Sequence, residues 1–238
     1  MNRWMLALAP LVLACAGQEE KLPPPPDPLY ETREKHDPNG IGKVYLGREI
    51  AHIMGPVGIS WLDRAERDQQ EQPAKVVEAL ELKEDDVVCD LGAGSGYYTF
   101  RLAPKLPKGK VLAVEIQDEM IKELKKHIEK KETTNVEIIK GTEKDPKLPE
   151  KGVDLILMVD VYHELAFPYE TMLAIRKAMK PGARVVLVEF RKEDPKVPIK
   201  EVHKMSEEQI KKEMTAVGLT HVKTVGTLPW QHIAIYKK

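Results

Sequence analysis

The stretch Val87-Val88-Cys89-Asp90-Leu91-Gly92-Ala93-Gly94-Ser95-Gly96-Tyr97 is a short apolar run that ends in an acid and then breaks into alternating glycines. It predicts a buried strand that leads into a ligand-binding loop and then a helix, expected near residues 97–106. A loop at the carboxyl end of a parallel strand approaches a ligand closely only where side chains are absent, as they are at alternate positions here. The free N–H groups at the helix start favour negative charge in the same space.

Two classes of ligand compete for such a loop. Dinucleotide-binding folds use G-x-G-x-x-G, and Tyr97 stands where the third glycine would be. The spacing here is G-x-G-x-G, with Asp90 two places before the first glycine. A second apolar segment ends at Glu115, about 20 residues after the glycines, the distance expected for a carboxylate that receives both ribose hydroxyls. The alternatives are a solvated strand-end acid for Glu115 and a simple tight turn for the glycines.

The glycine loop resembles motif I of the class I S-adenosylmethionine-dependent methyltransferases. This resemblance implies S-adenosyl-L-methionine as the cofactor, with Asp90 helping to hold the ammonium of its methionine moiety and the loop backbone lying against it. The cofactor-binding residues expected around the first two strands are Asp90, Gly92, Ala93, Gly94, Gly96, Tyr97, Glu115 and Ile116.

The resemblance covers residues 73–238 and implies an α/β fold. We expect a Rossmann-like, seven-stranded, mostly parallel sheet with helices on both faces and an antiparallel last strand. The alternation of strand and helix patterns from about residue 40 points the same way. Strands are predicted near residues 86–90, 110–115, 135–139, 153–159 and 183–190, with a closing pair at 222–225 and 233–236; helices are predicted at 97–106, 118–131, 168–180 and 206–217.

The composition indicates one globular domain without a nucleic-acid partner. The chain has 238 residues, of which 42% are hydrophobic and 32% charged, enough to bury a core. The net charge is −1, so no overall basic field attracts nucleic acid. A small-molecule methyl acceptor is the expected partner, and the sequence does not indicate an oligomeric state.

The first residues have the pattern of an export signal. Arg3 precedes an apolar run, and Val12-Leu13-Ala14-Cys15 resembles a bacterial lipobox, which implies a signal peptide over residues 1–14 and acylation of Cys15. Residues 15–40, with four consecutive prolines, would be a tether, so that the membrane is contacted only through the lipid on Cys15. An ordinary secretory signal cut near residues 16–17 and an uncleaved leader on a cytoplasmic protein are the alternatives.

Residues 41–72 are expected to form an N-terminal helical lid. Short helices are predicted at residues 48–54 and 61–70. Family members often cover the substrate with this region, which implies that Trp61 and Arg64 contact the acceptor. Ordinary core packing is the alternative for Trp61.

Two further strand ends carry candidate residues. After the third expected strand, the resemblance implies a polar residue near the adenine amino group, and both Thr142 and Glu143 stand at that point. After the fourth strand, it places Asp160 near the methionine part of the cofactor. His163 is the expected general base, because imidazole titrates near neutral pH. Tyr162 is a second catalytic candidate. The alternative for His163 is a structural histidine bonded to a neighbouring carbonyl, and the alternative for Tyr162 is a packing aromatic.

A charged, proline-containing loop after residue 190 is the predicted acceptor wall. Arg191 and His203 are expected there, with Arg191 able to clamp a carboxylate or phosphate, and Trp230 is expected at the same edge from the corner at residues 229–232. A solvated loop is the alternative. Acidic residues and histidines could converge at the same edge, but no H-x-x-x-H or C-x-x-C spacing is present, so no metal is predicted.

Two other functions remain open from the sequence. One is an exported, membrane-tethered protein that binds a nucleoside or S-adenosylmethionine without turnover, suggested by the conflict between an export signal and a cytosolic cofactor. The other is a dinucleotide-dependent reductase, which Tyr97 disfavours.

Overall fold

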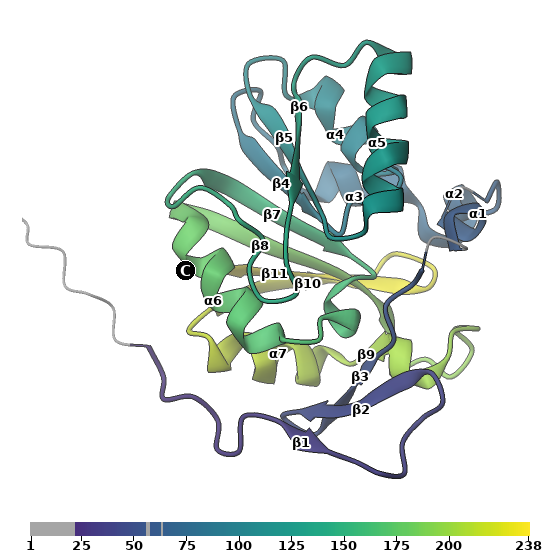
Figure 1. The fold of residues 1–238 in the computed structure, drawn as a ribbon, viewed down its shortest axis with the longest axis vertical. Coiled ribbons are helices and arrows are strands. Elements are labelled where there is room, and N and C mark those ends of the chain that lie inside the picture. The colour runs from purple at the N-terminus through teal and green to yellow at the C-terminus, as the bar shows by residue number, and fades with distance from the viewer. Residues whose placement is uncertain (1–21, 56–57, 63) are drawn as a thin grey trace, which may run out of the picture.

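One mixed β-sheet is the centre of the computed structural model, which describes residues 22–55, 58–62 and 64–238 (Figure 1). The strand order is β10-β11-β8-β7-β4-β5-β6. The strands are β4 (Val87–Leu91), β5 (Lys110–Glu115), β6 (Val136–Lys140), β7 (Val153–Val159), β8 (Met179–Arg191), β10 (Thr220–Val225) and β11 (Gln231–Lys237). β4 to β8 are parallel, and β11 is antiparallel to both β8 and β10. The predicted fold class is therefore confirmed.

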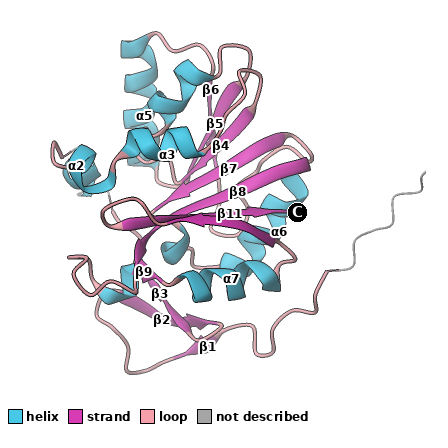
Figure 2. Ribbon diagram, turned by 180° about the vertical axis from the view of Figure 1, so that it is seen from behind, coloured by secondary structure: helices cyan, strands magenta, loops and turns pink. Residues whose placement is uncertain are grey.

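Helices cover both faces of this sheet (Figure 2). α3 (Pro73–Ala79), α4 (Thr99–Leu102) and α5 (Asp118–Lys131) lie on one face, and α6 (Pro168–Ala178) and α7 (Glu207–Ala216) lie on the other. Alternate residues of β7 divide accordingly, because Leu155 packs in one cluster with Val76 of α3 whereas Ile156 packs in another with Met172 of α6. Burial on both faces explains the nearly continuous apolar runs of the parallel strands.

The element boundaries follow the sequence closely except at the first helix. α5 has the predicted bounds, and Ser206 caps α7 by accepting a hydrogen bond from Gln209 N. The predicted helix at 97–106 is instead the short α4 followed by a 3₁₀ turn, η2 (Ala103–Lys105). Pro104 explains the break, because it has no N–H to continue the α-helical bonding.

The segment before the main domain differs from the prediction. β1 (Glu31–Thr32), β2 (Gly40–Tyr45) and β3 (Arg48–Ala51) form a separate antiparallel sheet, so the helix predicted at 48–54 is wrong and the expected tether includes a strand. Leu46 and Gly47 both have positive φ, 51° and 92°, as a tight hairpin turn requires. α1 (Ile59–Leu62) and α2 (Arg67–Glu71) follow. The expected signal peptide and Cys15 lie outside the described residues.

A short two-residue strand, β9 (Lys204–Met205), extends the sheet beyond the expected seven strands. It pairs in parallel with the end of β8, with Phe190 opposite Lys204. This pairing brings the chain just before β9 to the carboxyl edge of the sheet.

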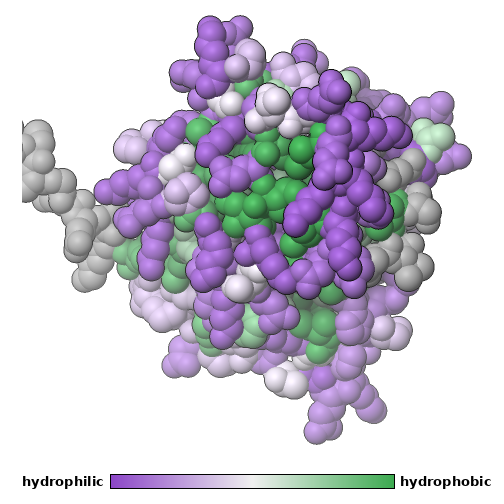
Figure 3. Space-filling view, turned by 45° about the horizontal axis from the view of Figure 1, so that its top comes forward, coloured by the Kyte–Doolittle hydropathy of each residue, from purple (hydrophilic) through white to green (hydrophobic). Residues whose placement is uncertain are grey.

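Hydrophilic side chains surround a central group of hydrophobic ones on the face in Figure 3. Among the described residues, no helix combines the length and apolar character needed to cross a bilayer.

Candidate functional site

The carboxyl ends of the parallel strands open into a cavity of about 640 Å³. Small-molecule sites typically measure about 300–1,000 Å³, and in open α/β sheets they lie at this edge. The strand-end walls comprise Gly92, Gly94, Glu115, Ile116, Thr142, Glu143, Asp160, His163 and Glu164. His52, Ile53 and Met54, which follow β3, and Trp61 and Leu62 of α1 also line it, so the chain before α3 contributes a wall.

The glycine loop is held against the end of β5. Gly92 N and Ala93 N both donate to Val114 O, at 2.9 and 3.1 Å. Gly92 has φ +73°, and a Cβ at this position would lie 2.6 Å from Val161 Cγ2. Any side chain there would therefore strain the backbone and collide with the loop after β7.

Glu115 ties the two loops together. Its Oε2 accepts from Gly94 N at 2.9 Å, and its Oε1 accepts from Ile116 N at 2.7 Å and Gln117 N at 2.9 Å. The residue is buried and lines the cavity, so it is not a solvated strand-end acid. A carboxylate offers about four lone-pair sites, and these three bonds leave capacity for a ligand hydroxyl.

Other predicted loop residues lie behind the wall. Asp90 Oδ2 accepts the Thr99 hydroxyl at 2.6 Å, and burial raises the pKa of Asp90 to about 6 despite this bond. A Cβ on Gly96 would lie 2.4 Å from Phe100 Cε2, so Gly96 permits close packing. Ala93 is buried and does not line the cavity.

Tyr97 also points away from the cavity. Its hydroxyl donates to Asp68 Oδ1 at 2.8 Å, and the Arg67 guanidinium lies 3.9 Å from its ring centroid. The Tyr97 side chain therefore fastens α2 to the loop, which corrects its expected contact with the cofactor.

Asp160 presents an unsatisfied acid to the cavity. Its Oδ2 accepts from Gln231 Nε2 at 2.7 Å, whereas Oδ1 is buried with no hydrogen-bond partner in the described part of the chain. Burial, with the nearby charges of Glu71 and Glu189, raises the pKa of Asp160 well above its ordinary value. Its φ of 53° is unusual for a residue with a side chain and marks local strain.

Acidic side chains outnumber permanently basic ones along the described walls. The acids are Glu71, Glu115, Glu143, Asp160 and Glu164, and the bases are Arg67 and Lys200. Glu71 is paired with Arg64 and Arg67, and the raised pKa values of Asp160 and Glu164 mean that a cationic ligand would stabilise the charged forms of these two acids. The lining therefore favours a cationic ligand over the pyrophosphate of a dinucleotide.

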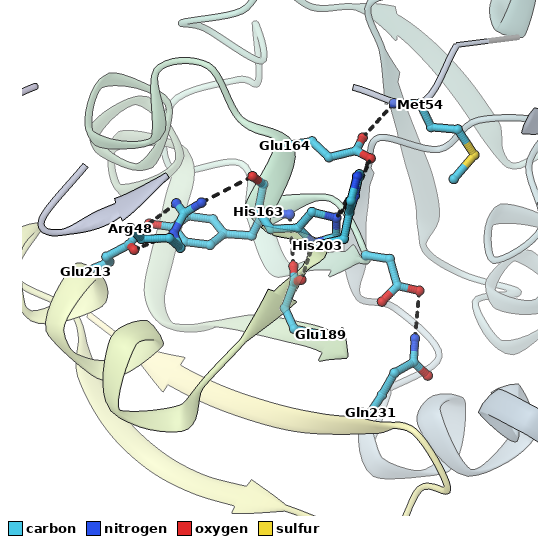
Figure 4. Close-up of polar contacts among 10 residues, drawn as sticks. Arg48, Met54, His163, Glu164, Glu189, His203, Glu213 and Gln231 are labelled. Carbon is cyan, nitrogen blue, oxygen red and sulfur yellow. Dashed lines mark hydrogen bonds and ion pairs between the residues drawn. The ribbon is translucent and has the colours of Figure 1, made fainter. Parts of the chain in front are cut away.

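His163 is the centre of a buried polar cluster (Figure 4). Its Nδ1 lies 2.5 Å from Glu189 Oε2, and its Nε2 lies 3.1 Å from His203 Nδ1. Burial lowers the pKa of His163, but the Glu189 carboxylate outweighs it, so that the pKa is raised overall. Burial and the charge of His163 lower the pKa of His203 to about 4. When no ligand is bound, the proton shared by His163 Nε2 and His203 Nδ1 therefore resides on His163.

Glu164 completes this cluster. Its Oε2 accepts from Met54 N at 3.1 Å, and its Oε1 lies 3.8 Å from His163 Nε2 and 3.6 Å from His203 Nδ1. Burial raises the pKa of Glu164 to about 7, although His163 opposes the shift.

Tyr162 does not reach the cavity. Its side chain is fully buried in the core, and the Arg48 guanidinium lies 5.6 Å from its ring centroid. Arg48 also forms a two-pronged pair with Glu213 and donates to His163 O at 3.2 Å. The expected catalytic role of Tyr162 is thus corrected to packing, because in the 3₁₀ turn η3 (Tyr162–Glu164) the side chain of Tyr162 joins the hydrophobic core whereas His163 and Glu164 line the cavity.

The predicted acceptor residues separate into two groups. Trp61 and His203 line the cavity. Arg64 lies behind it, with Nη2 bonded to Glu71 at 2.5 Å, and Arg191 donates to the carbonyls of Leu228 and Pro229. The carbonyl of Trp230 accepts from Arg191 N, and its side chain does not line the cavity. Arg191 and Trp230 shape a loop instead of a wall, so the basic acceptor clamp is not formed.

Several residues that shape the site were not assigned a role from the sequence. Glu189 is an acid within the apolar run of β8, and this placement is a usable signal for a buried partner. Gln231 and Met54 carry no such signal, because their contacts with Asp160 and Glu164 depend on long-range pairing.

Comparison with known proteins gives consistent matches. A family profile described as methyltransferase domain matches residues 82–234. A protein-lysine N-methyltransferase of Saccharolobus islandicus is 35% identical over 135 residues, which cover 54% of this chain and 81% of that protein. A tRNA U34 carboxymethyltransferase of Desulfotalea psychrophila is 35% identical over 102 residues, but these span 42% of this chain and only 31% of that protein. The crystal structure of a SAM-dependent methyltransferase from Aquifex aeolicus superposes with a TM-score of 0.73 at 28% identity, covering 77% of this chain and 98% of that one.

Proposed function

The chain belongs to the class I S-adenosylmethionine-dependent methyltransferases, and from that premise we propose that its acceptor is a small polar molecule methylated on oxygen, nitrogen or sulfur inside the cavity. The observation that carries this proposal is a cavity of small-molecule size with walls on opposite sides. Residues from the segment after β3 and from α1 line it opposite the strand ends, which leaves a chamber of about 640 Å³.

The charge of the cavity supports the position of the cofactor. S-adenosylmethionine supplies a methyl group already activated by its sulfonium, and it also carries an ammonium. Asp160 Oδ1, buried without a partner among the described residues, is available to a cationic group, which would in turn stabilise the charged form of this acid. Glu115, Thr142 and Glu143 all line the cavity, which supports the proposal that Glu115 receives the ribose hydroxyls and that Thr142 and Glu143 contact the adenine end.

The segment after β3 is fastened across the cavity. Met54 N donates to Glu164 Oε2, and Met54 O accepts from Gln117 Nε2 at 3.0 Å. These bonds connect the segment to two walls of the chamber. Holding the acceptor in line with the methyl group and excluding water supply most of what this reaction needs, since orientation alone is worth several kcal/mol.

His163 remains our proposed contact for the acceptor nucleophile. Glu189 fixes its Nδ1 edge, and its Nε2 edge lies with His203 and Glu164 at the cavity wall. The other two predicted acceptor contacts that line the cavity, Trp61 and His203, belong to the same chamber.

The names of two relatives indicate larger acceptors, a protein lysine and tRNA. Incubating the enzyme with methyl-labelled S-adenosylmethionine and cell extract separates the possibilities. We expect label in the low-molecular-weight fraction, and label confined to protein or RNA would contradict a small acceptor. Cofactor binding without any labelled product would favour the tethered binding protein.

We also propose that residues 1–14 direct export and that Cys15 becomes the acylated first residue. The support is the lipobox Val12-Leu13-Ala14-Cys15. Intact mass measurement of the chain expressed in a bacterium should show loss of residues 1–14 and addition of acyl chains. A Cys15→Ser variant should lose the lipid, and an unprocessed wild-type chain would contradict this proposal.

A further inference from the structure

We infer that His163, Glu164 and His203 form a binding site for a divalent transition-metal ion that holds the acceptor. The inference about the acceptor rests on the proposed function, whereas the ion site itself rests on geometry. These three residues place one ligand atom each around a common point at the cavity wall.

The distances among the ligand atoms match a metal site. His163 Nε2, His203 Nδ1 and Glu164 Oε1 are separated by 3.1, 3.6 and 3.8 Å. A point about 2.0 Å from all three atoms lies within this triangle, and zinc binds histidine nitrogen and carboxylate oxygen at about 2.0–2.2 Å. The Glu164 oxygen is too far from either nitrogen for a hydrogen bond, so protein contacts alone leave the centre of the triangle unfilled.

Each ligand is already oriented by a second contact. Glu189, itself fully buried, lies 2.5 Å from His163 Nδ1 and holds a proton there, so an ion that displaces the proton shared with His203 finds the lone pair on Nε2. Metal-binding histidines commonly have such a carboxylate partner. Met54 N fixes the other oxygen of Glu164, and Arg48 donates to the His163 carbonyl.

The donor set and the opening indicate the kind of ion and its use. Two imidazoles and one carboxylate suit Zn²⁺ or Fe²⁺ better than Mg²⁺ or Ca²⁺, which prefer oxygen ligands. Three protein ligands at a cavity wall leave a position for an exogenous molecule, as in catalytic zinc sites. The ion would therefore bind an acceptor through a hydroxyl or thiol, and His163 would act on the acceptor through the ion.

An ion at this site would activate the acceptor for methyl transfer. The bound acceptor group loses its proton to water, because a divalent cation lowers the pKa of a coordinated O–H or S–H. Its lone pair forms the new bond to the methyl carbon while the carbon–sulfur bond breaks and its electron pair goes to sulfur. The products are the methylated acceptor, S-adenosylhomocysteine and one proton.

Metal content tests the site independently of activity. The full-length chain is stripped with a chelator and titrated with Zn²⁺ by calorimetry, beside His203→Ala, Glu164→Gln and the control His221→Ala. His221 lies on β10 and bonds Thr224, away from the cluster. We expect one more Zn²⁺ bound by wild type and His221→Ala than by either cluster variant. Cys15 is common to all four chains, so only this difference counts.

S-adenosylmethionine titration of the same samples separates the two proposals. Retained cofactor binding by His203→Ala together with lost Zn²⁺ binding shows a folded chain lacking only the ion site. Equal Zn²⁺ binding by wild type and both cluster variants would overturn the metal site. Zn²⁺ binding without cofactor binding would leave the site standing and overturn its use in methyl transfer. Glu189→Gln should weaken Zn²⁺ binding about 10- to 100-fold, the usual cost of losing an orienting partner.

Discussion

Glu115 both holds two loops of the site together and lines its cavity. Its carboxylate accepts three backbone hydrogen bonds from two loops, and it lines the cavity at the point where we propose that the ribose binds. The sequence predicted its position from spacing alone. It could not predict the bond to Gly94, because that bond depends on how the loop folds back.

Replacing Glu115 with Gln tests its role. The amide cannot accept at both ends, and charge-assisted hydrogen bonds contribute about 1.5–3 kcal/mol each, so S-adenosylmethionine affinity should fall on the order of 10- to 100-fold. Calorimetry measures this change. Glu137→Gln is the matched control, because Glu137 is exposed on the neighbouring β6 and pairs with Lys110. An unchanged dissociation constant for Glu115→Gln would remove it from the cofactor site.

The buried acid of Asp160 should lower the stability of the ligand-free protein and increase its affinity for S-adenosylmethionine. Because its pKa is raised in the folded state, its contribution to stability is greatest below about pH 4, the ordinary pKa, and is lost as the pH rises. Asp160→Asn should therefore raise the Tm at pH 8 by about 2–4 °C, or about 1 kcal/mol, and the gain should shrink toward pH 4. The same variant should bind S-adenosylmethionine about tenfold more weakly. A lower Tm with unchanged affinity would contradict both expectations.

Directions of side chains limited prediction at this scale. The side chains of Arg191, Tyr97 and Tyr162 contact other parts of the protein instead of the cavity, and the Trp230 side chain does not line it either. His203 shows the opposite case, since β9 pairing brings it to His163 across 40 residues. A spacing rule therefore cannot reveal the His163–Glu164–His203 cluster.

The β2–β3 hairpin supports the site through one buried ion pair. Arg48 of β3 binds both oxygens of Glu213 on α7 and also the carbonyl of His163. The sequence predicts a helix here, because Leu46 is not a residue type that indicates the positive φ of this turn. Arg48, Ile50 and Ala51 of β3 are buried, and Ile50 packs in the same cluster as Met172 of α6, a long-range contact that the sequence does not reveal.

Arg48→Met should be strongly destabilising. It leaves Glu213 buried without its charge partner, which typically costs about 3–5 kcal/mol. The double variant Arg48→Met with Glu213→Leu should recover much of that loss in urea unfolding. Lys108→Met is the control, because its partner Glu84 is exposed and such pairs contribute about 0–1 kcal/mol. A loss as small as that of the control would show that the hairpin is not fastened here.

At the scale of the whole molecule, the sheet order and the two helical layers were predictable. Apolar runs and glycine breaks specify the parallel strands locally, and the closing antiparallel pair follows the family pattern. The sequence predicts that the segment before the main domain covers the site, but it predicts a helical lid where β2 and β3 form. The position of this segment depends on long-range contacts such as Met54 with Glu164 and Gln117, which no local pattern records.

The central claim is that the acidic cavity beyond β4 and β5 binds S-adenosylmethionine. Calorimetric titration of the purified full-length chain tests it most directly, with NAD⁺ titrated in parallel. We predict saturable binding of one S-adenosylmethionine per chain and no binding of NAD⁺, whose pyrophosphate the acidic walls oppose. Binding of NAD⁺ in preference to S-adenosylmethionine, or binding of neither, would contradict this account of the site.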